Sequence, residues 1–176
     1  MALRNILHDD DPALRKKSRK VEVFNERIHE LIDDMRETLQ NANGIGLAAP
    51  QVGVLRRIVL VVDVENEDEE NDAIIELINP EIIETSGEQE GLEGCLSVPG
   101  VWGIVERPDY VKVRAFDRFG NEFEVDGKMV TARAFCHEID HLEGKIFTEL
   151  AKKLLNEDEL NELLAEDEPD EDEECE

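Results

Sequence analysis

The spacing of apolar side chains predicts three helices in this chain. In residues 25–43 they recur at steps of three and four with charged residues between them, which places them on one face of an amphipathic helix near the N-terminus. Asn43 and Gly44 end that helix, because glycine readily takes the left-handed conformation found at helix C-termini. Residues 130–143 show the same spacing, and leucines predict a last helix over 154–165.

Runs of β-branched residues predict the first strands. Residues 57–64 and 73–79 form two such runs, which are separated by an acidic loop at 65–72. Pro80 interrupts the second run, because proline cannot donate a hydrogen bond to a neighbouring strand. The two isoleucines at 82–83 are candidates to extend the sheet beyond it.

Alternation of apolar and polar residues predicts further strands. A half-exposed strand is expected at 110–116, and turn signals on both sides bracket a short strand at 122–125. Residues 90–103 combine glycine, proline and cysteine without a period, so we expect an irregular segment there. These elements indicate an α+β fold with small antiparallel or mixed sheets and no second domain.

Composition excludes several classes of protein. The 176 residues carry 45 acidic and 19 basic side chains, a formal charge of −26, so we expect no direct contact with nucleic acid, whose phosphates require the opposite charge. The apolar runs are far shorter than the ~20 residues of a membrane helix, and the N-terminus has no signal-peptide pattern, so we expect a cytosolic protein without membrane contact. Three scattered cysteines do not form a disulfide framework.

The acidic excess is concentrated at the C-terminus. Residues 157–176 hold 13 acidic side chains and no lysine or arginine, so half of the formal charge of −26 belongs to this segment. After Ala165, Cys175 is the only hydrophobic residue, and such a composition is typical of disorder. We therefore predict one domain over residues 1–153, followed over 154–176 by a C-terminal helix and an acidic, disordered tail.

The segment HEIDH at 137–141 is the sharpest chemical signal. Residues four apart lie on one face of a helix, so His137 and His141 can bind one metal ion while Glu138 lies beside it. A glutamate in that place can take a proton from metal-bound water and later pass it to a leaving group. Two histidines alone are not a catalytic site, because a catalytic metal needs a third protein ligand.

The residue pattern leaves that third ligand open. A metzincin site requires histidine at position 147, where this chain has Phe147, so that class is excluded. A thermolysin-like zinc endopeptidase would take a downstream glutamate, such as Glu157 or Glu162. Cys95 offers a soft thiolate, although a small buried hydrophobic residue is equally in keeping with its surroundings. The two remaining histidines are expected to be solvated.

Three segments of the chain resemble the signature segments of the peptide deformylase family. They are GIGLAAPQ at 44–51, EGCLS at 93–97 and HEIDH at 137–141, and the likeness covers essentially the whole predicted domain. The family removes the formyl group from the N-terminal methionine of newly made bacterial and organellar proteins. The resemblance implies a fold with the HExxH helix at the centre of small sheets. It also implies a bacterial cytoplasmic hydrolase that acts on nascent formyl-methionyl peptides and releases formate.

The resemblance also assigns roles in catalysis. Three residues would hold one divalent metal ion: Cys95, His137 and His141. That ion would be Fe²⁺ in the cell, with Zn²⁺, Ni²⁺ or Co²⁺ as substitutes. Glu138 would act first as general base and then as general acid. The side-chain amide of Gln51 and the backbone N–H of Leu96 would stabilise the negative charge that develops on the formyl oxygen.

Substrate contacts follow from the same resemblance. Gly44 and Gly46 would allow an extended peptide to approach the backbone closely. The methionine side chain would be surrounded by His137 together with Ile45, Val130, Arg133 and Ala134. An ion pair between Glu93 and Arg107 would brace the loop that carries the cysteine.

Two features depart from the family pattern. Cys136 precedes the first histidine, where many members have glutamine, and one step along a helix turns it away from the metal, so we expect a packing residue. Some members carry a basic C-terminal helix that docks on the ribosome, and the acidic segment 157–176 cannot contact RNA phosphates in that way. Any ribosome association would therefore use another route. A binding protein without catalysis is the alternative, but no expected site residue is missing.

Overall fold

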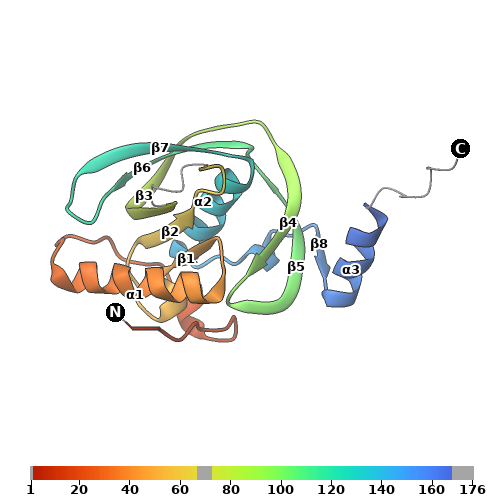
Figure 1. The fold of residues 1–176 in the computed structure, drawn as a ribbon, viewed down its shortest axis with the longest axis horizontal. Coiled ribbons are helices and arrows are strands. Elements are labelled where there is room, and N and C mark those ends of the chain that lie inside the picture. The colour runs from red at the N-terminus through yellow and green to blue at the C-terminus, as the bar shows by residue number, and fades with distance from the viewer. Residues whose placement is uncertain (1, 67–72, 168–176) are drawn as a thin grey trace, which may run out of the picture.

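The computed structural model describes residues 2–66 and 73–167 as two antiparallel sheets and three α-helices (Figure 1). The larger sheet has five strands in the order β1-β2-β3-β6-β7. These are β1 (Gly46–Ala48), β2 (Ile58–Val62), β3 (Ile74–Ser86), β6 (Tyr110–Phe116) and β7 (Glu122–Lys128). The smaller sheet contains, in order, β4 (Gln89–Cys95), β5 (Val98–Arg107) and β8 (Lys153–Leu155). The predicted α+β class is confirmed.

Two helices cover opposite faces of the larger sheet. Helix α1 (Glu26–Ala42) packs on one face and helix α2 (Met129–Leu142) on the other. In β2, Ile58 and Leu60 join the core cluster beneath α1, while Val59 and Val61 join the cluster beneath α2. Because both faces of this strand are buried, its sequence is a continuous apolar run and does not alternate.

Helix α1 lies where the apolar spacing predicts it. The side chain of Asn25 caps its start by accepting a hydrogen bond from the backbone N–H of Ile28 at 3.3 Å. Asn43, with φ of 53°, takes the left-handed conformation that we expected of Gly44. Asparagine tolerates this conformation, and Gly44 is needed for another reason: a Cβ there would lie 3.0 Å from Leu96 Cδ1.

The expectation of an irregular segment at 90–103 is wrong. This stretch forms most of the β4–β5 hairpin, with Glu90 opposite Glu106 and Gly94 opposite Trp102. Glycines interrupt the alternation of apolar and polar residues in these strands, because they leave space for side chains of residues distant in sequence. A Cβ on Gly94 would lie 3.0 Å from the Trp102 ring. The regularity comes from the pairing and not from local side-chain preference.

The C-terminal helix is shorter than predicted. Leu155 pairs with Trp102 as part of β8, and helix α3 (Glu157–Glu166) begins only after Asn156. Asn156 and Glu159 form a capping box, in which each side chain bonds the other residue's backbone N–H. The leucines that resembled a helical pattern are therefore shared between a strand and a helix.

Two strands also extend past their predicted ends. β3 passes through Pro80, where a register shift and the positive φ of Asn79 (51°) form a bulge, so the sheet does continue beyond the proline. β7 continues through Asp126 and Gly127, which we expected to be a turn, because both pair with β6.

Parts of two predicted segments lie outside the described residues: positions 67–72 of the acidic loop and 168–176 of the tail. No helix within residues 2–66 and 73–167 is long and apolar enough to cross a membrane.

Candidate metal centre

Three side chains from two elements converge at one point. His137 and His141 lie one turn apart on α2, and Cys95 is the last residue of β4. Their ligand atoms all lie within 4.8 Å of one another, and Cys95 Sγ is 3.4 Å from His141 Nε2. The β4–β5 hairpin thus brings the cysteine to the helix. The two are distant in sequence, since Cys95 lies 41 positions before Cys136, the residue that directly precedes the histidine pair.

This donor set fits a four-coordinate divalent ion. Sulfur and nitrogen ligands at ordinary bond lengths around one tetrahedral ion lie about 3.6 Å apart, close to the observed 3.4 Å. One thiolate and two imidazoles also leave a fourth position open, as catalytic sites require. No other such group of three occurs in the described part of the chain. Glu157 and Glu162, the alternative third ligands, lie on α3 and are exposed.

Glu138 is buried beside these ligands. It is 4% exposed, and its Oε2 atom has no hydrogen-bond partner among the described residues. Burial raises the pKa of this carboxyl to about 7, because the low-dielectric surroundings disfavour the charged form. Gly46 on β1 provides the space, since a Cβ there would lie 2.5 Å from Glu138 Oε1. A carboxyl with such a pKa can both accept and donate a proton near neutral pH.

Gln51 is held in contact with the sulfur of Cys95 by three hydrogen bonds of its side-chain amide. It lies in a short 3-10 turn (Ala49–Val52) and is 1% exposed. Its Oε1 accepts a hydrogen bond from the backbone N–H of Ala48 at 2.9 Å. Its Nε2 donates to Ser97 Oγ at 3.1 Å and to Cys95 Sγ at 3.4 Å. The turn therefore fixes which end of the amide faces the site. Leu96 lies in the β4–β5 turn, between Cys95 and Ser97, the two residues that the amide contacts.

A cleft of about 360 Å³ opens beside these residues. Of the predicted substrate contacts, those that line it are Gly44, Ile45, Gly46, Arg133, Ala134 and His137. Val130 does not line it: this residue lies in the first turn of α2 and is 44% exposed. The sequence reasoning missed Leu92, Pro99, Val101 and Trp102, which also line the cleft. They belong to the hairpin that we expected to be irregular, so no strand pattern could place them.

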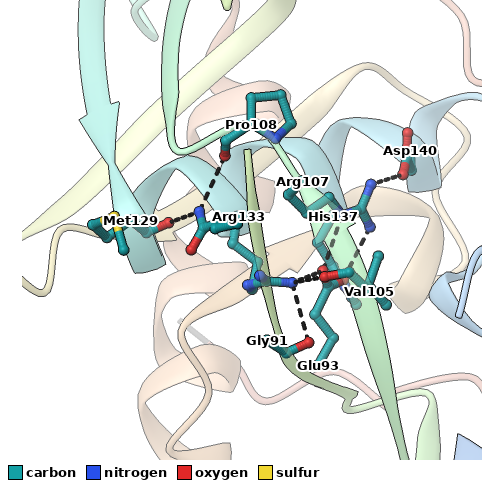
Figure 2. A network of polar contacts seen from close by, with 10 residues as sticks. Gly91, Glu93, Val105, Arg107, Pro108, Met129, Arg133, His137 and Asp140 are labelled. Carbon is teal, nitrogen blue, oxygen red and sulfur yellow. Dashed lines mark hydrogen bonds and ion pairs between the residues drawn. The ribbon is translucent and has the colours of Figure 1, made fainter. Parts of the chain in front are cut away.

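Glu93 connects the hairpin to the helix through a buried network (Figure 2). It accepts a hydrogen bond from His137 Nδ1 at 2.8 Å, which leaves the other ring nitrogen for a metal. The expected ion pair with Arg107 is present, with two contacts of 2.9 Å. Although burial opposes ionisation, the hydrogen bonds from His137 and Arg107 lower the pKa of Glu93 to about 2. Arg133, expected only as a pocket wall, directs its guanidinium into this network.

The remaining cysteine and histidines lie outside the group. Cys136 is buried in the core cluster between α2 and the larger sheet, as expected of a packing residue, and burial raises the pKa of its thiol to about 11. His8 is exposed. His29 is half-buried, with its ring nitrogen 2.7 Å from the carbonyl oxygen of Arg118 and its ring edge-on to Phe119, so it is less solvated than expected.

Comparison with known proteins identifies the family. The family model described as polypeptide deformylase matches residues 3–157. The peptide deformylase of Acetivibrio thermocellus is 54% identical over 160 residues, which cover 91% of this chain and 90% of that protein. The peptide deformylase of Lachnoclostridium phytofermentans is 58% identical over 149 residues, covering 85% and 89%.

Solved structures agree with this assignment. The peptide deformylase from Legionella pneumophila superposes with a TM-score of 0.79 at 40% identity, covering 96% of this chain and 100% of that one. The enzyme from Thermotoga maritima gives 0.80 at 32% identity, covering 87% and 100%. The family matches span the hairpin, the glycine-rich segment and helix α2 together. The chain therefore belongs to the polypeptide deformylase family, the metal-dependent hydrolases that remove the N-formyl group from nascent peptides.

Proposed function

We propose that Cys95, His137 and His141 hold the divalent metal ion of this deformylase and that Glu138 transfers the proton. The observation that carries the proposal is the convergence of one sulfur and two imidazole nitrogens within 4.8 Å beside a buried carboxyl. A divalent ion held there would lower the pKa of water and polarise the formyl carbonyl.

The protein's own groups then account for the proton transfers. Glu138 accepts a proton from the attacking water as oxygen bonds to the formyl carbon. It next donates this proton to the amide nitrogen as the C–N bond breaks. The products are formate and a peptide with a free amino group. The 4% exposure of Glu138 supports this role, because a buried carboxyl near pKa 7 exchanges the proton with the reactants and little with solvent.

Substrate binding is proposed to use the cleft and the free edge of β1. This strand is at the end of the sheet order, so an extended peptide can add to it by backbone hydrogen bonds along Gly44 and Gly46. Ile45, Arg133 and Ala134 would contact the methionine side chain, since all three line the cleft. The Leu96 backbone N–H and the Gln51 amide would donate to the formyl oxygen.

We propose Fe²⁺ as the ion in the cell, with Zn²⁺, Ni²⁺ or Co²⁺ able to replace it, because thiolate and imidazole ligands suit all four. The test is anaerobic purification with metal analysis, paired with a formate-release assay on formyl-Met-Ala peptides. We expect one ion per chain and an activity that is lost on chelation and restored by Fe²⁺. A loaded protein that releases no formate would count against the proposed site.

Replacing Gln51 by alanine tests the proposed oxyanion donor. Loss of one such donor lowers kcat by about 10²- to 10³-fold, so steady-state formate release should fall by this factor while metal content stays constant. Ser97→Ala is the control, because it removes only the other partner of the same amide, at 3.1 Å. Equal effects of the two substitutions would show that Gln51 acts through packing and not through its amide.

We propose that the catalytic unit, predicted at residues 1–153, extends to Leu155, because β8 pairs with β5, and that the acidic segment after it lies outside this unit. Helix α3 begins with Glu157, Asp158 and Glu159 and has no basic residue in its last turn. We therefore propose that the enzyme meets nascent formyl-methionyl peptides in the bacterial cytoplasm without docking a basic C-terminal helix on RNA. Any ribosome contact would have to use another surface.

Removing residues 168–176 should leave catalysis unchanged. This truncation deletes acidic side chains and keeps every described residue that lines the cleft or belongs to the metal-ligand group. We expect kcat/KM for a formyl-methionyl peptide equal to that of the full chain at low and high salt. A KM that rises at low salt after truncation would instead show that the tail attracts the substrate, and a KM that falls would show that the tail repels it.

A further inference from the structure

Arg133 lines the cleft, but its buried guanidinium contacts the β4–β5 hairpin. It is 7% exposed and lies on α2 one turn before His137. Its Nη1 atom donates to Glu93 Oε2 at 2.7 Å and to the Val105 carbonyl oxygen at 2.9 Å (Figure 2). The Gly91 carbonyl oxygen lies 3.4 Å away from the same atom. One guanidinium nitrogen thus contacts both strands of the β4–β5 hairpin, whose first strand ends in Cys95.

These contacts complete the hydrogen bonding of the Glu93 carboxylate. Oε1 accepts from Arg107 Nη2 and from His137 Nδ1, at 2.9 and 2.8 Å. Oε2 accepts from Arg107 Nε and from Arg133 Nη1, at 2.9 and 2.7 Å. Four donors in these positions prevent the carboxylate from rotating, and charge-assisted bonds of this kind are the strong ones. The orientation of the His137 ring depends on the Oε1 atom that this arrangement fixes.

The charges within the network balance. Two carboxylates, Glu93 and Asp140, face two guanidiniums, Arg107 and Arg133, and Arg107 Nη1 also donates to Asp140 at 2.7 Å. Buried charges persist only when they are paired and hydrogen-bonded in this way. Removal of Arg133 would leave one excess negative charge and take away one of the two donors to Glu93 Oε2, which would keep only Arg107 Nε.

Gly91 on β4 makes the position of the guanidinium possible. A Cβ at residue 91 would lie 2.9 Å from Arg133 Nη2 and 3.2 Å from Cζ. The backbone of Gly91 is not in the left-handed region, so an alanine there would act on Arg133 through contact and not through backbone strain. The glycine and the arginine therefore form a matched pair across the hairpin and the helix.

We propose that Arg133 is a positioning residue of the metal centre, which holds the β4–β5 hairpin on α2 and, through Glu93, fixes the ring of His137. The inference rests on the proposed role of His137 as a ligand. Arg133 thereby couples the wall of the substrate cleft to the ligand set: its stem can contact substrate while its guanidinium orients the metal-binding ring.

Arg133→Met tests this role, because methionine keeps an apolar stem at the cleft wall and removes the charge and the donors. We expect Co²⁺ release to a chelator to accelerate, and kcat to fall, by about 10- to 100-fold, the cost typical of losing an outer-shell partner of a metal ligand. KM for formyl-Met-Ala should stay near that of the parent enzyme. The absorption band of the Co²⁺-loaded protein should also shift, which a purely structural role would not cause.

Two further variants and one control complete the test. Arg133→Lys keeps the charge and one donor group, so its rate of metal release should lie between those of the parent enzyme and Arg133→Met. Gly91→Ala should accelerate metal release although Arg133 itself is unchanged. It provides the test of the proposal if Arg133→Met does not fold. Arg114→Met, which removes a half-buried arginine that lies on β6 and pairs with Glu122 and Glu124, should leave release and kcat unchanged.

The outcomes separate this inference from the proposed function. Parental metal release and kcat in folded Arg133→Met, or a raised KM with unchanged kcat, would overturn the positioning role. Binding of one ion by His137→Ala with parental affinity would instead overturn the ligand assignment itself. If His137→Ala loses the ion while Arg133→Met and Gly91→Ala keep the parental release rate, the ligand assignment stands and the positioning role of Arg133 is rejected.

Discussion

Replacing Glu138 by glutamine is expected to lower kcat for formate release by about 10²- to 10⁴-fold, the usual contribution of a general acid–base group. Glutamine matches glutamate in size but accepts no proton, so water attack and departure of the amine both lose their proton carrier. The side chain should stay in place, because the space beside Gly46 that accommodates a carboxyl also accommodates an amide. Metal content and thermal stability should therefore match the parent enzyme.

The measurement is steady-state formate release at saturating substrate, with metal analysis of the same sample. Glu143→Gln is the matched control. Glu143 follows directly after α2, and its side chain is 37% exposed and pairs with Arg57, so its loss should leave kcat unchanged. A Glu138→Gln enzyme that retains more than about a tenth of parental kcat would assign the proton transfers to another group.

The parts of the fold with a strong local period could be predicted from the sequence. The spacing of apolar residues located α1 and α2 to within about one residue, because apolar residues recur at helical steps along both of them. The β4–β5 hairpin could not be predicted, because its period is interrupted by glycines whose function is to admit distant side chains. Gly91 admits Arg133, and Gly94 admits Trp102. Such contacts exist only in the folded molecule.

The candidate site was predictable to a similar extent. The two histidines and Glu138 follow from the four-residue repeat of a helix, since the repeat alone brings them together. From spacing alone, Cys95 could be either a metal ligand or a core residue. It lies 41 positions before Cys136, the neighbour of the first histidine, and local sequence rules do not predict how close in space two such distant residues lie. The resemblance to a family favoured the ligand. The distance of 3.4 Å to His141 Nε2 adds an independent geometric argument.

The second role of Arg133 could not be found from the sequence in the same way. An arginine one turn before a metal-binding histidine can point to solvent, to substrate or to the core. Here the choice depends on Glu93 and on the Val105 carbonyl oxygen, which approach from the hairpin. Burial of a charged group is a tertiary property, because the charge must first meet its partners.

Replacing Cys95 by alanine is expected to remove the metal ion and with it the activity. It deletes one of three protein ligands, so the loss of metal affinity should exceed the 10- to 100-fold that removal of an outer-shell partner costs. Glu138 and both histidines would remain, and the apo protein should keep its fold, because Cys95 contributes only at the edge of a core cluster. Metal stoichiometry after gel filtration, together with formate release, measures both effects.

Two matched variants make this result specific. Cys136→Ala removes a buried thiol one residue from His137 and should keep both the ion and the activity, because Cys136 lies in the core cluster between α2 and the sheet. Glu162→Ala removes the alternative ligand of an endopeptidase-type site and should also have no effect, since that side chain is exposed on α3. Metal retained by Cys95→Ala and lost by Glu162→Ala would reverse the assignment. These outcomes test the third ligand alone, because both kinds of site share the histidine pair of α2.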